Sequence, residues 1–147
     1  MNVSKYKKRK LLVAAILCGL CLAWLIDVSH QLVVANQLKR MGAQITIRCG
    51  NVTDVAFTPQ SQNVSDDDMS LLDNLRHLDW LHLQYTRVGF GGLSAVAKKH
   101  PGLRIISVRD DQLTRGEERE LTRVCPELTV ERLIIASDGR RIVKGFE

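Results

Sequence analysis

The sequence has little excess charge of either sign beyond its first ten residues. Of its 21 lysine and arginine residues, five lie between Lys5 and Lys10, and from Leu11 onward the remaining 16 basic residues face 16 acidic ones. A nucleic-acid-binding domain concentrates its basic residues on the folded part of the chain. The net charge of +5 therefore reflects an N-terminal cluster, and we expect no nucleic-acid partner.

The sequence also lacks the motifs that carry catalysis or hold a cofactor. Gly89-Phe90-Gly91-Gly92 has no Lys-Ser/Thr of a phosphate loop, and no serine lies in a nucleophile elbow. Asp66-Asp67-Asp68 has neither the alternate spacing nor the glycine of a calcium loop, and suits a helix N-terminus better. His77 and His82 have no further partner at ligand spacing, which favours exposed histidines. We predict no catalytic residue, no metal, no cofactor and no enzymatic activity.

One long uncharged run stands out in a chain whose 45% apolar content is otherwise ordinary for a globular protein. It extends from Leu11 to Ile26 and covers about 24 Å as a helix, slightly less than a hydrocarbon core of roughly 30 Å. Trp24 suits the headgroup level, and apolar residues from Val28 onward could prolong the helix. The preceding basic cluster predicts a single-pass protein of the cytoplasmic membrane, with a cytoplasmic N-terminus and the remaining chain outside the cytoplasm.

The same run could belong to a cleaved signal peptide, a lipoprotein signal or a buried core helix. A cleaved signal peptide has the same basic and apolar regions, although no small-x-small cleavage site follows Trp24. Neither Cys18 nor Cys21 follows a lipoprotein box. A buried core helix fits poorly beside five basic residues. An uncleaved anchor is our interpretation, and whether the segment is cleaved stays open.

The residues after the anchor complete a division of the chain into four segments. Residues 30–41 keep Leu32, Val33, Leu38 and Met41 in a helical pattern that Gly42 ends. Residues 43–48 and 52–57 alternate as strands around a Gly50-Asn51 turn. We therefore expect a basic cytoplasmic segment (1–10), a transmembrane signal-anchor helix (11–28), a connecting amphipathic helix (29–42) and a folded domain (43–147).

An internal repeat defines that domain. Leu78-x-x-Leu81-x-Leu83-x-x-Thr86-x-Val88 recurs at an offset of 25 as Leu103-x-x-Ile106-x-Val108-x-x-Asp111-x-Leu113. Val52-x-x-Val55-x-Phe57 fits upstream at an offset of 26. Each strand precedes a helical pattern, made by Met69, Leu72 and Leu75, by Leu93, Val96 and Ala97, and by Leu121 and Val124, with Asp66 and Thr114 as N-cap candidates.

Such units cannot bury their apolar faces alone and must stack. We predict an α/β fold, a short β-α solenoid of about three units. Residues 130–135 and 141–146 flank Asp138-Gly139 and predict a terminal β hairpin. In this arrangement Cys49 and Cys125 lie about three strand steps apart, near 15 Å, which is too far for a disulfide.

The repeat resembles leucine-rich repeat proteins over about residues 32 to 130. More narrowly, it is similar to small repeat proteins of planctomycete bacteria, which open with a helix ending like Leu38-Lys39-Arg40-Met41-Gly42-Ala43. Those proteins carry Val-Thr-Asp after the strand, whereas this chain has Val88-Gly89-Phe90 and Leu113-Thr114-Arg115. The resemblance implies a binding or scaffolding role without catalytic residues.

We expect any function to lie on the exposed strand face. Its candidate residues are Asp79, His82, Gln84, Ser107 and Arg109, with Ala56 and Thr58 in the first unit. This mixed-charge row suits a protein partner of unknown identity better than an apolar ligand, although the positions could be merely solvated. Alternatively, the chain is a structural subunit of a membrane complex that assembles through the transmembrane helix.

Overall fold

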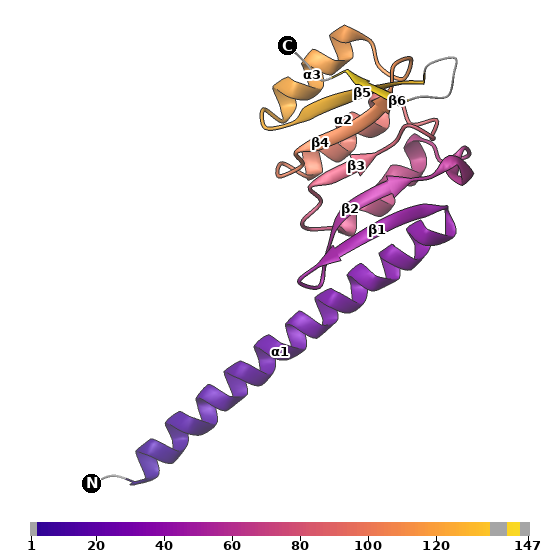
Figure 1. The fold of residues 1–147 in the computed structure, drawn as a ribbon. Helices are drawn as coiled ribbons and strands as arrows, with labels where there is room; N and C mark the ends of the chain where they lie inside the picture. Colours follow the sequence, from indigo (N-terminus) through magenta and orange to yellow (C-terminus); the bar gives the residue numbers. More distant parts are fainter. Residues whose placement is uncertain (1–2, 136–140, 145–147) are drawn as a thin grey trace.

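A computed structural model describes residues 3–135 and 141–144 as a long helix followed by a mixed α/β domain (Figure 1). The elements in chain order are α1 (Val3–Arg40), β1 (Ala43–Arg48), β2 (Asn51–Phe57), the 3-10 helices η1 (Pro59–Ser61) and η2 (Asp66–Asn74), β3 (Trp80–His82), α2 (Phe90–Lys99), β4 (Ile105–Arg109), α3 (Arg115–Val124), β5 (Thr129–Ile135) and β6 (Arg141–Lys144). The α/β class is as predicted, and Asp138-Gly139 of the predicted terminal turn lies outside the described residues.

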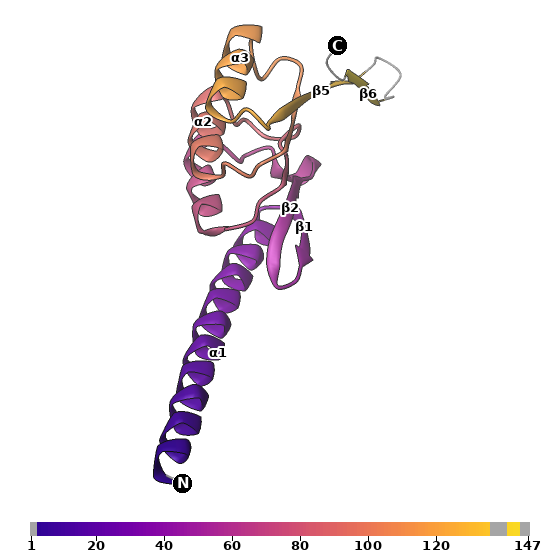
Figure 2. The same ribbon diagram turned by 90° about the vertical axis from the view of Figure 1, so that its left-hand side faces the viewer.

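The described strands form one six-stranded sheet in the order β1 to β6. Strands β2 to β5 are parallel, and β1 and β6 pair antiparallel at the two edges. η2, α2 and α3 all lie on one side of this sheet (Figure 2). The sheet therefore has one covered face and one face without helices.

The strand pairing follows the repeat spacing at two of three junctions. Leu81 pairs with Ile106, and Val55 pairs with Leu81, each at the offset that the sequence predicts. The last junction is shorter than the repeat by a single position, because Ile106 pairs with Val130. Alternate strand residues point toward the helices and form the core, namely Val55, Phe57, Leu81, Leu83, Ile106, Val108 and Val130.

Helix α1 is continuous through the predicted anchor and connecting segments. Its last turns belong to the domain core, because Gln31, Val34, Ala35 and Leu38 are buried. The Gln31 side-chain oxygen accepts a hydrogen bond from Val52 N at 3.2 Å, which joins α1 to β2. Of the apolar residues in the predicted helical pattern, Leu38 is buried, whereas Leu32 and Val33 are exposed. Gly42 ends the helix with φ +88°, as predicted.

The helix starts follow local capping chemistry. Thr114 is the predicted N-cap of α3, and its hydroxyl accepts from Glu117 N in a capping box. Asp66 is not the N-cap of η2, because Ser65 fills that position. Asp66 instead accepts a hydrogen bond from Gly89 N at 2.7 Å and so reaches the start of α2. The expected helix at Met69 and Leu72 is a 3-10 helix, although both residues are buried as the pattern requires.

Candidate partner-binding face

The sheet face without helices carries two rows of aligned side chains. Asp54, Trp80, Ile105 and Thr129 are neighbours across β2 to β5, and so are Ala56, His82, Ser107 and Glu131. Successive strand residues point to opposite faces, so both rows point away from the buried leucines. We call these eight residues and Arg109 the outer face.

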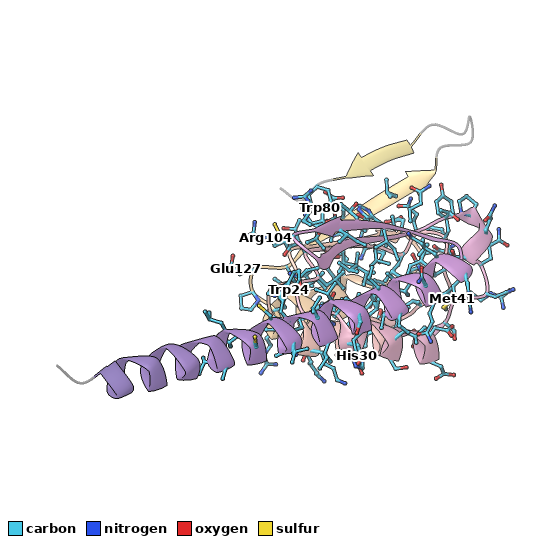
Figure 3. The ribbon with its side chains drawn as sticks, turned by 90° about the horizontal axis from the view of Figure 1, so that it is seen from below. Trp24, His30, Met41, Trp80, Arg104 and Glu127 are labelled. Atoms are coloured by element: carbon cyan, nitrogen blue, oxygen red, sulfur yellow. The ribbon has the colours of Figure 1, made fainter. Side chains whose placement is uncertain are left out.

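Trp80 is the most conspicuous residue of the outer face. It is 44% exposed, and Figure 3 shows it on the side of the sheet away from the helices. Its ring meets that of His82 edge-on, with centroids 6.0 Å apart, and such pairs hold aromatic rings in a defined orientation. Directly opposite Trp80 lie Asp54 on β2 and half-buried Ile105 on β4.

The sequence interpretation missed Trp80 and chose Asp79 in its place. Asp79 precedes β3 and shares the parity of Leu81, so it does not belong to the outward rows. Its backbone instead links three strands, donating to Thr53 O and accepting from the amides of Arg104 and Ile105. Strict alternation outward from Leu81 would have identified Trp80 and His82.

Ser107 was predicted to be exposed and is buried at 1%. Its hydroxyl donates to Glu131 Oε2 at 3.0 Å, across from β4 to β5. The neighbouring strands screen this small side chain from solvent, so Ser107 can position the Glu131 carboxylate but offers little contact surface itself. His82 and Gln84 are half-buried, and the Gln84 side-chain oxygen is buried without a hydrogen-bond partner in the described residues. Thr58 donates to Gly42 O at 2.7 Å.

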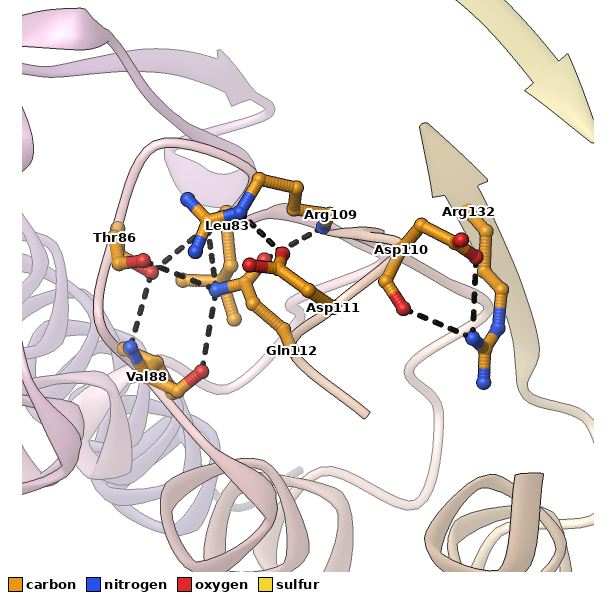
Figure 4. Close-up of polar contacts among 8 residues, drawn as sticks. All are labelled: Leu83, Thr86, Val88, Arg109, Asp110, Asp111, Gln112 and Arg132. Atoms are coloured by element: carbon orange, nitrogen blue, oxygen red, sulfur yellow. Dashed lines mark hydrogen bonds and ion pairs between the residues drawn. The ribbon is translucent and has the colours of Figure 1, made fainter. Parts of the chain in front are cut away.

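Arg109 lies beside a polar network at the carboxyl ends of the strands (Figure 4). Its guanidinium binds Asp111, and this hydrogen bond holds the pKa of the Asp111 carboxyl below its usual value. The repeat aligns Asp111 with Thr86, yet the next residue, Gln112, makes the hydrogen bonds to the preceding unit. Gln112 Nε2 donates to the carbonyl oxygens of Leu83, Thr86 and Val88 at 3.1–3.2 Å.

The far end of the helical layer is closed by a buried ion pair. Arg132 on β5 points toward the helices and binds Glu118 of α3 at 2.9 Å, with side chains 15% and 8% exposed. Arg132 also reaches Asp110 at 3.2 Å (Figure 4). Burial tends to lower the pKa of Arg132, but the bonds and charges of Glu118 and Asp110 outweigh it and raise the pKa. This charged pair occupies a position that is apolar in the preceding strands.

Other groups that could carry chemistry are dispersed. Among the described residues, no three His, Cys, Asp or Glu side chains gather closely enough to hold a metal ion, and His77 is exposed on the loop before β3. Cys49 is exposed in the β1–β2 turn, whereas Cys125 is buried after α3, and both are free thiols. Two surface hollows share Lys39, Gly42 and Gln60, away from the outer face.

Comparison with known proteins identified no relative: no protein family, curated protein or solved structure matches the chain significantly.

Proposed function

We propose that this chain is a membrane-anchored, non-enzymatic protein of leucine-rich-repeat type, whose outer face binds a protein partner. The β-α units support the repeat assignment, because the parallel pairs Asp54–Trp80, Trp80–Ile105 and Ile105–Thr129 follow one another at nearly constant sequence spacing. The connecting helices all lie on one side (Figure 2). This is the pattern expected of a short solenoid with β1 and β6 at its ends.

The N-terminal helix supports the anchor. From Ala15 to Arg40 it is long and apolar enough to cross a membrane by length and composition. Very little of its most apolar stretch is buried in the fold. A core helix of a soluble domain buries such a surface against its own fold. The positive residues before Leu11 favour a cytoplasmic N-terminus, with the sheet outside the cytoplasm.

Trp80 is the observation that carries the binding proposal. Tryptophan is enriched among the residues that dominate interface energies, especially near the centre of a contact. Here it stands on a rigid strand, with the apolar Ile105 on one side and the carboxylate of Asp54 on the other. Glu131 adds a second carboxylate in the next row. A partner with an apolar patch bordered by basic side chains complements this surface.

Co-purification of the full-length protein from its native host tests the proposal. Trp80→Ala is expected to lose the partner, whereas Arg119→Ala is the matched control, because Arg119 is exposed on α3 in the helical layer. Retention of every specific partner by Trp80→Ala would contradict binding through the outer face.

Assembly through α1 is the competing function, and a helix exchange separates the two. Replacing residues 11–28 by an unrelated transmembrane sequence keeps the domain and its membrane attachment. A partner bound by the outer face is retained after this exchange. Loss of the partner after the exchange, together with its retention by Trp80→Ala, would assign the protein to the structural subunits instead.

A further inference from the structure

The tip of the β1–β2 hairpin lies against the part of α1 that is proposed to enter the membrane. Gly50 lies beside α1, since a Cβ atom there would be in van der Waals contact with it, 3.4 Å from Val28 Cγ2 and 3.8 Å from Trp24 Cζ2. Both views show the β1–β2 turn reaching along α1 toward its N-terminal half, beyond the rest of the sheet (Figures 1 and 2). The depth of the hairpin tip is thus tied to the depth of Trp24 and Val28.

The length of the apolar helix determines that depth. The uncharged run ends at Ile26, about 24 Å along the helix from Leu11, and Asp27 follows it. Exposed apolar side chains continue beyond this point, because Leu32 and Val33 are 47% and 58% exposed. Trp24 and Val28 therefore lie near the headgroup level at the outer boundary of the bilayer, and Gly50 lies beside them.

The side chains of the tip suit that environment. Ile47 is 42% exposed, and the pairing register of β1 with β2 shifts between Thr46 and Ile47. Arg48 forms an ion pair with Asp54 at 3.8 Å, and because its side chain is 70% exposed, its guanidinium can still reach a lipid phosphate. Cys49 and Gly50 have positive φ angles and form a tight two-residue turn, instead of the predicted Gly50-Asn51 turn.

We propose that residues 47–50 enter the headgroup region of the outer leaflet and form a second membrane contact beside α1. This inference rests on the proposed anchor. The contact fixes the rotation of the domain about the helix axis, because the domain then touches α1 at Gly50 as well as at the buried residues Gln31 and Leu38. β1 then lies nearest the membrane and β6 farthest from it, so partners reach the outer face from the side.

Spin labelling of the full-length protein in vesicles of phosphatidylcholine and phosphatidylglycerol tests the contact. Cys18 and Cys21 are replaced by alanine and Cys125 by serine, which leaves Cys49 as the labelling site in the tip. In this background, a label at Cys49 is compared with labels at two other positions. One is Leu20→Cys within the apolar run, and the other is Glu127→Cys on the exposed turn before β5. Both comparison variants also carry Cys49→Ser.

The expected result is a label at Cys49 whose ratio of collisions with dissolved oxygen to collisions with a water-soluble nickel complex lies between those at positions 20 and 127, with position 20 favouring oxygen. The label at position 127 should show the opposite preference. A lipid-like label at position 20 with a water-like label at Cys49 overturns the hairpin contact and leaves the anchor standing. Water-like labels at both positions overturn the anchor and the hairpin contact together.

Discussion

Removal of Arg132 is expected to destabilise the domain because it leaves the buried carboxylate of Glu118 without its ion-pair partner. Glu118 is 8% exposed and receives bonds from Arg132 Nε and Nη2 at 3.2 and 2.9 Å. Breaking one side of a buried pair costs about 3–5 kcal/mol. We expect Arg132→Met to cost about 3 kcal/mol, the lower end of that range, because the Arg132 side chain is 15% exposed. The bond to Asp110 adds little, since Asp110 is 60% exposed.

Urea unfolding of the full-length protein in detergent, followed by circular dichroism, measures this change. The double variant Arg132→Met, Glu118→Leu removes both charges and should recover most of the stability lost in Arg132→Met. Arg123→Ala is the matched control, since its pair with Glu120 is exposed and should contribute at most about 0.5 kcal/mol. A loss below about 1 kcal/mol in Arg132→Met, or no recovery in the double variant, would refute this reasoning.

Three further changes test the interior of the domain by the same unfolding assay. Gln112→Ala leaves three carbonyl oxygens without their side-chain donor and should cost about 1–3 kcal/mol; Gln112→Glu should cost more, and equal stability would contradict the network. Gly92→Ala places a Cβ 2.7 Å from Asp66 Oδ1 and 3.1 Å from Asp66 Cα. This overlap should lower the free energy of unfolding by about 1–3 kcal/mol. An unchanged urea midpoint would argue against this close approach. Burial lowers the pKa of His100 below 6.5, although a backbone hydrogen bond with Leu72 opposes this. The unfolded chain therefore binds a proton more readily than the folded one, so the free energy of unfolding should fall as the pH drops below 6.5. His100→Phe should flatten this pH dependence.

Periodicity and capping rules predicted the parts of the fold that depend on local pattern. The internal repeat predicted the pairing of β3 with β4 because each strand needs the same inward residues at the same depth. Thr114 was recognised as an N-cap candidate because it directly precedes a helical pattern, and the structure adds a capping box with Glu117. The helical spacing of Met69 and Leu72 could not distinguish a 3-10 from an α-helix, since both bury a residue at every third position.

The errors in the candidate site have a shared physical origin. The candidate residues were chosen among the positions between the inward apolar residues without applying the strict alternation of a strand between its two faces. This rule excludes Asp79 and selects Trp80. The burial of Ser107 depends on the neighbouring Glu131, which is distant in the sequence and adjacent only in the folded sheet. Gln112 replaces its neighbour Asp111 in the network because only an amide donates to carbonyl oxygens.

Photocrosslinking from position 80 of the full-length protein in its native host tests the central claim most directly. Benzoylphenylalanine replaces Trp80 in one variant and Arg119 in a second, and crosslinked proteins are identified by mass spectrometry. If the outer face binds a partner, position 80 yields a specific protein adduct that position 119 does not. Failure to form an adduct at position 80, or the same adducts from both positions, would contradict a binding role for the outer face.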